Sequence, residues 1–392
     1  MEISIDGGYV SADSHVIESP DLYELFATRM DKRFPGKAPR VESRPDGDYY
    51  VWDGVPAFGV GVSGEGGVID TKADGKPIET IHAQRHADTR PGAWDPMARL
   101  KDQDLDHVRA EVVYPGLLGM WGYIAPDPEY HREFVRVYND WLGEFCANAP
   151  DRLLGAGIVP MRGPIEWALE EAERIAAKGM RSLVLPIEMP GGWARWPDAE
   201  RFWTGLQELG LPIAFHVGSQ FEADEMLEET TRRDTDLETE TSGGRDAVAL
   251  IEQKVCQAAR GVSDLIWAGV PQAFPGLRFV IAECGIGWIA SILRLNDHWW
   301  EDHHLWMEPR LEEPPSFYFH RQFWATFEDD RAGLLTREML NVDHLMWGSD
   351  YPHTEGVFPF SRERISKDFA DIPEEETRKM VGGNAAALYG LS

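Results

Sequence analysis

The stretch Val10–Glu18 reads V-S-A-D-S-H-V-I-E and follows an apolar start from Ile3 to Val10 that is interrupted by glycines. Successive side chains of a β-strand point to opposite faces, so Asp13 and His15, two residues apart, point the same way. We expect both to lie off the end of the first strand of the fold. A carboxylate and an imidazole aimed into one space form half of a divalent-metal site. The other half is expected elsewhere in the chain.

Seven further short apolar segments follow, and helical patterns separate most of them. The expected strands are Ala110–Pro115, Leu153–Pro160, Met180–Pro186, Leu211–Val217, Leu277–Glu283, Phe323–Phe327 and Leu345–Asp350. Strands that alternate with helices form right-handed parallel crossover units, and eight such units close into a barrel. The pattern therefore predicts an α/β fold, a (β/α)8 TIM barrel. An open doubly wound sheet is the alternative, but no G-x-G-x-x-G follows the first expected strand.

We expect this barrel to form a single domain, residues 1–392, with two insertions. The first covers about residues 31–95, is rich in Gly, Pro, Asp and Arg, and has one strand-like piece at Tyr49–Trp52. Long loops inside compact domains are usually functional or disordered. The second insertion covers about residues 219–245 and is strongly polar, so it is expected to form a solvated surface loop.

The charge and composition exclude several classes of protein. The chain has 67 Asp and Glu against 38 Lys and Arg, a net charge of −29, which repels nucleic acid and anionic membranes. Three cysteines are too few for a disulfide framework or a Cys-rich zinc site. No window approaches 18 uninterrupted apolar residues, and no basic region followed by an apolar run begins the sequence. We expect a cytoplasmic protein with neither nucleic acid nor membrane as partner.

Polar residues collect at the ends of the expected strands, where the catalytic groups of a barrel lie. The fifth strand ends in I-A-F-H-V-G with His216, and the sixth ends in F-V-I-A-E-C-G with Glu283. The eighth ends in L-M-W-G-S-D-Y-P-H with Asp350 and, just beyond it, His353. Each residue alone has a simpler explanation, such as a turn, a core histidine or an ion pair. Because buried charges are costly unless they are paired or bind a metal, their joint occurrence predicts a metal site.

The motifs S-A-D-S-H-V-I-E, F-H-V-G, A-E-C-G-I-G-W and W-G-S-D-Y-P-H, in this order, closely resemble those of the amidohydrolase-related metal-dependent hydrolases. The most similar branch is the aminocarboxymuconate-semialdehyde decarboxylase group, which includes γ-resorcylate and 5-carboxyvanillate decarboxylases. The resemblance spans nearly the whole chain. It implies a distorted (β/α)8 barrel that binds one divalent metal ion, usually Zn²⁺ or Mn²⁺.

The resemblance also implies roles for the residues at the strand ends. Asp13, His15, His216 and Asp350 match the metal ligands, and Asp13 stands where the family often has histidine. Asp350, Glu283 and His216 form the expected catalytic group. Glu283 departs from the family pattern, because many members have a functional histidine at that position. The identity of the acid or base therefore stays open.

Two reactions fit these groups. We expect a non-oxidative decarboxylase of an aromatic or unsaturated carboxylic acid, in which the metal binds the substrate's carboxylate and Asp350 protonates the carbon as CO₂ leaves. In the alternative, a hydrolase of a lactone, an amide or a ring-cleavage product, the metal lowers the pKa of bound water and Asp350 takes its proton. A metal-free barrel that serves as a binding or scaffold protein is the second alternative.

The expected partner is a small-molecule carboxylic acid or carbonyl substrate. A decarboxylase needs a cation for the substrate's carboxylate, and Arg85, Arg181 and Arg245 are candidates without a predicted position. Trp52 and Trp94 of the first insertion could cover an aromatic ring or belong to an interface. Members of the branch are often dimers or larger, and the 15 tryptophans of the chain offer apolar surface for a homo-oligomer.

Overall fold

The computed structural model describes residues 8–45, 47–52, 55–60, 85–125, 127–193, 198–219, 251–353 and 356–391. Eight parallel strands form one sheet in the order β1-β5-β6-β7-β8-β9-β10-β11. The strands are β1 (Tyr9–His15), β5 (Val108–Tyr114), β6 (Leu153–Ile158), β7 (Ser182–Leu185), β8 (Ile213–His216), β9 (Phe279–Ala282), β10 (Phe323–Phe327) and β11 (Leu345–Trp347). Ser14 of β1 forms a parallel bridge with Tyr351, just after β11, and this bridge closes the sheet. The predicted barrel is confirmed.

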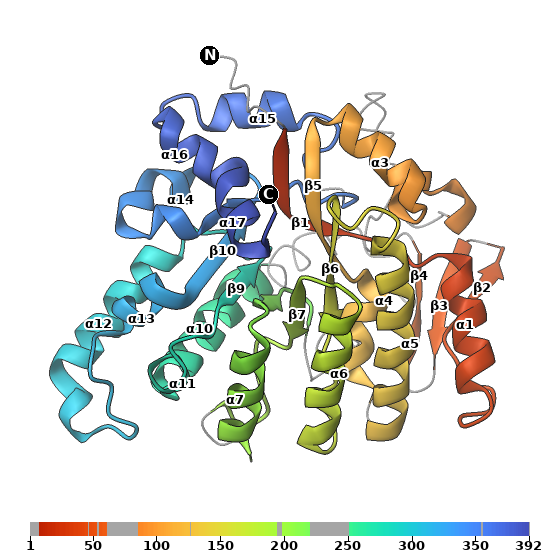
Figure 1. The fold of residues 1–392 in the computed structure, drawn as a ribbon, viewed down its shortest axis with the longest axis horizontal. Coiled ribbons are helices and arrows are strands. Elements are labelled where there is room, and N and C mark those ends of the chain that lie inside the picture. The colour runs from red at the N-terminus through yellow and green to blue at the C-terminus, as the bar shows by residue number, and fades with distance from the viewer. Residues whose placement is uncertain are drawn as a thin grey trace, which may run out of the picture.

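The apolar runs of the sequence are continuous because the strands are covered on both sides. Every residue of β8 and of β9 is buried. Side chains of parallel strands face the barrel interior on one side and the surrounding helices on the other, so both sets must be apolar. Figure 1 shows the helices arranged around the sheet.

The first strand differs from the prediction, because Asp13 and His15 lie within β1 and not beyond its end. The strand continues this far because its backbone pairs on both sides. The His15 N–H donates to the Tyr351 carbonyl at 2.6 Å, and the Asp350 N–H donates to the Asp13 carbonyl at 2.9 Å. The register against β5 shifts between Ser11 and Ser14, an irregularity of the kind that redirects side chains near active sites. The expected start at Ile3 lies outside the described residues.

Helices separate most of the strands, as the sequence predicted. They are α1 (Pro20–Met30), α3 (Pro96–Leu105), α4 (Leu117–Met120), α5 (Pro128–Cys146), α6 (Ile165–Ala177), α7 (Ala199–Leu209), α10 (Ala258–Trp267), α11 (Val270–Ala273), α12 (Ile289–His303), α13 (Pro315–Gln322), α14 (Arg331–Thr336), α15 (Ser361–Asp368), α16 (Glu374–Arg378) and α17 (Asn384–Tyr389). A π-helical turn, η6 (Glu252–Gln257), precedes α10. None of the described helices combines the length and the apolar character needed to cross a membrane.

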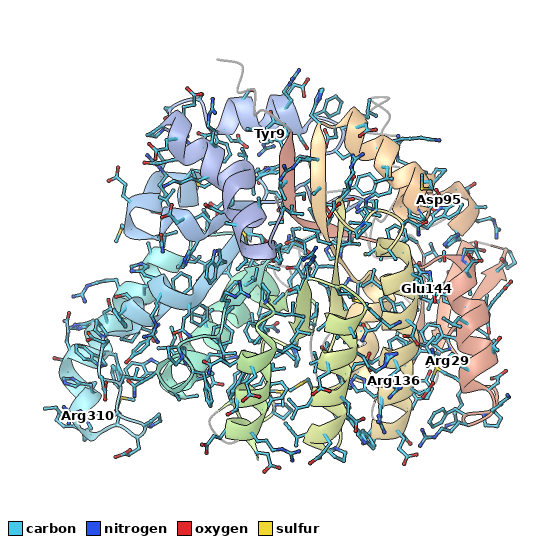
Figure 2. The ribbon with its side chains drawn as sticks, in the orientation of Figure 1. Tyr9, Arg29, Asp95, Arg136, Glu144 and Arg310 are labelled. Carbon is cyan, nitrogen blue, oxygen red and sulfur yellow. The ribbon has the colours of Figure 1, made fainter. Side chains whose placement is uncertain are left out.

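Local capping and ion pairs hold the outer helices in place. The Asp127 side chain accepts hydrogen bonds from the Glu129 and Tyr130 N–H groups at the start of α5 and so caps the helix. Arg29 of α1, labelled in Figure 2, forms ion pairs with Glu133 and Asp140 of α5. These contacts fix α1, which follows β1 in the chain, against α5.

The first insertion contains more structure than the sequence indicated. A three-stranded antiparallel sheet, β2 (Arg40–Arg44), β3 (Gly47–Trp52) and β4 (Val55–Gly59), occurs where we predicted one strand at Tyr49–Trp52. Trp52 is 3% exposed and belongs to the main core, so it is not available to cover a substrate. Most of the predicted polar insertion at about 219–245 lies outside the described residues. The division into one domain with two insertions stays a prediction.

Candidate metal centre

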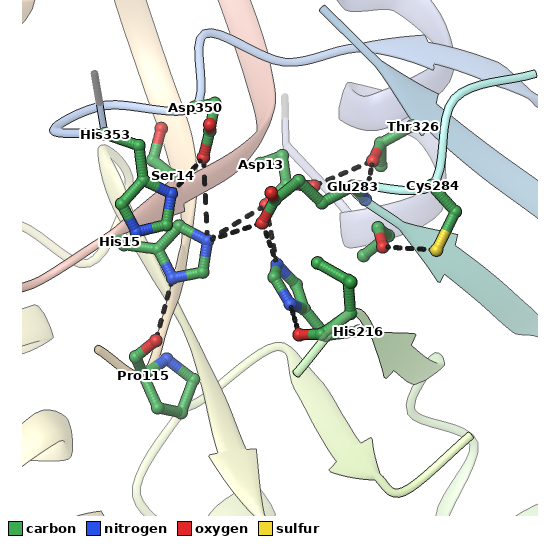
Figure 3. A network of polar contacts seen from close by, with 12 residues as sticks. Asp13, Ser14, His15, Pro115, His216, Glu283, Cys284, Thr326, Asp350 and His353 are labelled. Carbon is green, nitrogen blue, oxygen red and sulfur yellow. Dashed lines mark hydrogen bonds and ion pairs between the residues drawn. The ribbon is translucent and has the colours of Figure 1, made fainter. Parts of the chain in front are cut away.

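Histidine and carboxylate side chains meet at the carboxyl ends of four barrel strands (Figure 3). The members of this His–carboxylate cluster are Asp13 and His15 of β1, His216 of β8, Glu283 just after β9, and Asp350 and His353 after β11. All except His353 are at most 5% exposed. The structure thus brings together every residue for which the sequence predicted a metal-binding or catalytic role.

The distances in the cluster suit a single ion. His15 Nε2 lies 3.5 Å from Glu283 Oε2 and 3.7 Å from Asp350 Oδ1. His216 Nε2 lies 3.3 Å from Asp13 Oδ1 and 3.4 Å from Glu283 Oε2. Bonds of roughly 2.1 Å from a metal to its ligands put neighbouring ligand atoms about 3.0–3.4 Å apart. Small movements of the side chains would therefore place these atoms around one divalent cation.

The hydrogen bonds of the two histidines point to the same conclusion. His15 Nδ1 lies 2.8 Å from the Pro115 carbonyl, and His216 Nδ1 lies 2.7 Å from the Val217 carbonyl. A carbonyl only accepts, so each Nδ1 carries the hydrogen and each neutral ring has its lone pair on Nε2. The buried His15 Nε2 has no hydrogen-bond partner among the described residues. A cation among these atoms would satisfy the nitrogen lone pairs and the carboxylates together, so the residues fit a divalent metal.

The pKa values of Glu283 and Asp350, the two carboxyl groups with a predicted catalytic role, are shifted in opposite directions. Burial opposes ionisation of Glu283, but Lys254 and the histidines outweigh it and hold the pKa of Glu283 well below its usual range. Burial raises the pKa of Asp350 to about 6, against the opposing effect of His353. For His216, burial opposes the charged form, but Asp13 and Glu283 outweigh it and raise the pKa. Two carboxyl groups pushed apart in this way are typical of acid–base sites.

The backbone turns sharply at two cluster residues. Glu283 has φ +56° and Asp350 has φ +54°, the left-handed region that residues other than glycine rarely adopt. Such a conformation persists where surrounding contacts enforce it, and it is often found at active sites. The Glu283 N–H donates to Thr326 Oγ1 at 2.8 Å, and the Asp350 N–H is held by Asp13. Both carboxylates therefore leave their strands at a turn that directs them into the cluster.

Three contact residues of the cluster had no predicted role. Lys254 Nζ in η6 lies 2.8 Å from Glu283 Oε1. Thr326 of β10 donates to Asp13 Oδ2 at 2.8 Å, and its place near a strand end is too common for a threonine to have predicted this contact. His353 Nδ1 lies 2.8 Å from Asp350 Oδ1, and its ring stacks on His15 with the centroids 4.3 Å apart. No local signal distinguished Lys254 from an ordinary lysine in a helical pattern.

The arginine candidates for a substrate cation do not reach the cluster where the structure describes them. Arg85 pairs with Asp48 of the small sheet at 3.2 Å. Arg181 directly precedes β7 and so lies at the amino-terminal end of the barrel, opposite the cluster. Arg245 falls outside the described residues. Trp94 packs beside the small apolar group that contains Tyr351, the residue that follows Asp350.

Comparison with known proteins gives a consistent set of relatives. The sequence model of a family described as amidohydrolase matches residues 51–391. The 2-amino-3-carboxymuconate-6-semialdehyde decarboxylase of Dictyostelium discoideum is 23% identical, over 76% of this chain and 77% of the relative. The gamma-resorcylate decarboxylase of Rhodococcus jostii (strain RHA1) is 26% identical, over 77% of this chain and 92% of the relative.

Solved structures share the architecture. An amidohydrolase from Mycobacterium avium subsp. paratuberculosis K-10 superposes with a TM-score of 0.75 at 20% identity, over 99% of this chain and 100% of the other. A dihydroxybenzoic acid decarboxylase from Polaromonas sp. JS666, solved with manganese and 2-nitroresorcinol, has a TM-score of 0.63 at 16% identity, over 98% and 97% of the chains. At these identities the likeness establishes the fold alone, and it agrees with the barrel.

Proposed function

We propose that this chain, which belongs to the amidohydrolase family, is a metal-dependent non-oxidative decarboxylase of an aromatic or unsaturated carboxylic acid. The observation that carries the proposal is the buried meeting of histidine and carboxylate ligand atoms in two groups that share His15. The two curated relatives are both named as decarboxylases, which favours decarboxylation over hydrolysis. The proposed substrate is a small molecule, since relatives with this architecture act on aromatic acids of that size.

We assign Asp13, His15, His216 and Asp350 as the ligands of one divalent ion, Zn²⁺ or Mn²⁺. The carbonyl-bound Nδ1 atoms and the unpartnered His15 Nε2 support this assignment, and the manganese of the Polaromonas decarboxylase favours Mn²⁺. When bound, the ion would act as a Lewis acid for the carboxylate of the substrate and a neighbouring oxygen. The protein's part is to orient the substrate and to supply a proton.

Asp350 is the proposed proton donor. Its Oδ2 is buried and has no hydrogen-bond partner among the described residues, while Oδ1 faces His15 and His353. Because Oδ1 faces the two histidines, Oδ2 is the oxygen that would carry the proton to the substrate. The bond from the ring carbon to the carboxylate breaks, its electron pair stays on the carbon, the carbon takes the proton, and CO₂ leaves. Glu283, held ionised, would accept a hydrogen bond from a substrate hydroxyl.

The test uses purified protein supplied with Mn²⁺ or Zn²⁺ and a panel of aromatic acids that includes 2,6-dihydroxybenzoate and 5-carboxyvanillate. We expect CO₂ and the corresponding aromatic product without the carboxylate. In D₂O, one deuterium should appear at the carbon that carried the carboxylate. The Asp350→Asn variant, which keeps the shape of the side chain but cannot donate as an acid, should lose at least 100-fold in rate.

The alternatives give different results in the same assays. A hydrolase would release no CO₂ from this panel but would incorporate oxygen from ¹⁸O-labelled water into the product of a lactone or amide. A scaffold protein would bind no metal and transform neither class. A homo-oligomer and a cytoplasmic location stay predictions, and light scattering of the purified protein tests the first of them.

A further inference from the structure

The carboxylate of Glu283 faces two different groups with its two oxygens. Oε1 lies 2.8 Å from the amine of Lys254. Oε2 lies 3.5 Å from His15 Nε2 and 3.4 Å from His216 Nε2. The side chain of Glu283 is only 6% exposed, so water contributes little to its solvation. Its orientation in the cluster is therefore set by these protein contacts.

Lys254 carries a charge that the cluster needs. Burial would lower the pKa of its amine, but the carboxylates of Glu283, Glu328 and Asp350 outweigh burial and raise it, so the amine stays charged. A buried carboxylate is tolerated when a cation lies beside it. For the Oε1 side of Glu283, that cation is Lys254.

The segment that carries Lys254 is not an ordinary surface helix. Residues Glu252–Gln257 form a π-helical turn directly before α10, and the lysine side chain is 18% exposed. Insertions of this kind in helices occur often at functional sites, because the extra residue redirects side chains. Here the turn follows the strand that carries His216 and precedes the strand that leads to Glu283. A lysine from the segment between two cluster strands thus reaches the cluster.

We propose that Lys254 is a positioning residue, whose amine holds Oε1 of Glu283 so that Oε2 is directed at the Nε2 atoms of His15 and His216. The inference rests on the proposed function in one respect, namely that the cluster holds a divalent metal. The inference adds Glu283 to the four proposed ligands as a fifth group that faces the ion, and it adds Lys254 as a residue that acts through Glu283. Without the lysine, Glu283 would lose its Oε1 partner and could rotate away from the histidines.

The proposal predicts a defined effect on metal affinity. Partners that orient groups at a metal site are typically worth about 10- to 100-fold in metal affinity. Lys254→Met, which keeps the length of the side chain but not its charge, should weaken Co²⁺ binding about 10-fold. Lys254→Arg, which restores a cation, should recover part of this loss. The visible absorption of bound Co²⁺ should change in Lys254→Met, because the oxygen ligand field around the ion changes.

A double-mutant cycle separates positioning from an independent role. Glu283→Gln removes the charge that Lys254 is proposed to hold. If the lysine acts through Glu283, the double variant should bind Co²⁺ no more weakly than Glu283→Gln alone, since the two effects share one route. If the double variant instead loses the product of the two single-variant losses in Co²⁺ affinity, the proposal is overturned. The matched control is Lys101→Met in α3, an exposed lysine, which should bind Co²⁺ as the wild type does.

The experiment is titration of Co²⁺ into the metal-depleted full chain and each variant, followed by absorption and calorimetry, with thermal unfolding to verify the fold. If Lys254→Met binds Co²⁺ with wild-type affinity and an unchanged absorption spectrum, the inference is overturned. This holds even if the protein proves to be an active decarboxylase. A wild type that binds Co²⁺ but releases no CO₂ from any acid would refute the proposed reaction, and the effect of Lys254→Met on Co²⁺ binding would still decide the inference. A wild type that takes up no metal would overturn both.

Discussion

The hydroxyl of Thr326 donates a hydrogen bond of 2.8 Å to Oδ2 of Asp13 (Figure 3). The two residues belong to β10 and β1, strands that are separated in the sheet by β11. The same hydroxyl accepts the N–H of Glu283 at 2.8 Å. One buried threonine thus holds a carboxylate of the first strand and the left-handed turn after the sixth barrel strand, and it leaves Asp13 Oδ1 free to face His216.

Replacement of this hydroxyl should weaken the metal site without removing a ligand. Thr326→Val keeps the shape but breaks both hydrogen bonds, so we expect about a 10-fold loss in Mn²⁺ or Co²⁺ affinity. The buried Glu283 N–H, left unpaired, should also lower the free energy of unfolding by about 1–3 kcal/mol. Thr326→Ser keeps the hydroxyl and should bind metal nearly as the wild type does. Equal affinities for Val and Ser would contradict the bridging role.

A glycine next to the cluster makes room for Asp13. A Cβ at Gly348 would lie 2.6 Å from the Asp13 Cβ and 3.1 Å from its backbone nitrogen. Because strand backbone cannot yield as a flexible side chain does, Gly348→Ala should displace Asp13. We expect a loss of stability of about 1–3 kcal/mol and at least a 10-fold loss in metal affinity.

The control for this substitution lies in α7. A Cβ at Gly205 would meet only the far end of the Leu169 side chain within 3 Å, and that methyl group can turn away. Gly205→Ala should therefore keep wild-type metal affinity. Calorimetric titration of both variants is the measurement, and full metal affinity in Gly348→Ala would show that Asp13 tolerates the shift.

An ion pair beneath the site should dominate the stability of this region. Arg99 Nε lies 2.5 Å from Glu111 Oε1, and both side chains are at most 2% exposed. The guanidinium also lies over the ring of Tyr351, 4.1 Å from its centroid. Arg99→Met leaves the Glu111 carboxylate buried and unpaired, so unfolding in urea should show a loss of about 3–5 kcal/mol.

The double variant Arg99→Met/Glu111→Leu distinguishes the lost pair from lost packing. It removes the unpaired charge and should recover part of the stability, because an apolar pair of similar volume can replace a buried ion pair. A double variant less stable than Arg99→Met would mean that the contacts of Glu111, such as the 2.6 Å hydrogen bond from Gln103, matter more than its charge.

A buried aspartate far from the cluster should give the stability a pH dependence. Burial raises the pKa of Asp106 to about 7, against the opposing hydrogen bonds from Ser361 at the start of α15. In the unfolded chain this carboxyl ionises near pH 4. Between those two values the folded protein keeps a proton that the unfolded chain has lost. The contribution of Asp106 to the free energy of unfolding is therefore complete below about pH 4. It falls by on the order of 4 kcal/mol as the pH rises to 7.

Asp106→Asn isolates this effect, since an amide cannot titrate but can still pair with Ser361. The stability of the variant relative to the wild type should increase from pH 4 to pH 8 and change little above pH 8. Urea unfolding at a series of pH values is the measurement. Parallel curves for the two proteins would mean that Asp106 ionises normally in the folded state.

Metal content is the most direct check of the cluster itself. Elemental analysis should find about one tightly held divalent ion per wild-type chain and a loss of that ion in His216→Ala. An ion that binds only the folded protein also raises its stability, by about 2.7 kcal/mol at a free concentration of 100 times Kd. A chelator should therefore lower the unfolding temperature of the wild type and leave that of His216→Ala unchanged.

The sequence by itself determined the barrel and the residues that meet at its mouth. Eight apolar segments, four of which end in histidine or acidic residues, are local patterns, and a parallel barrel brings the ends of all its strands to one face. This is why the sequence alone indicates Asp13, His15, His216, Glu283 and Asp350, although their individual roles stay predictions. The same logic applied to Thr326, but a threonine near a strand end is too common to single out.

Other features were decided only by tertiary structure. The extension of β1 through His15 depends on pairing with Tyr351, more than 300 residues away. The small sheet at Arg40–Gly59 depends on strand pairings that the local sequence does not predict. Lys254 is the clearest case. In the sequence it is one lysine in a helical pattern, and its 2.8 Å approach to Glu283 exists only because η6 packs against the mouth of the barrel. The sequence determines the positions of the charged residues along the chain, whereas packing determines which of them come together in one buried site.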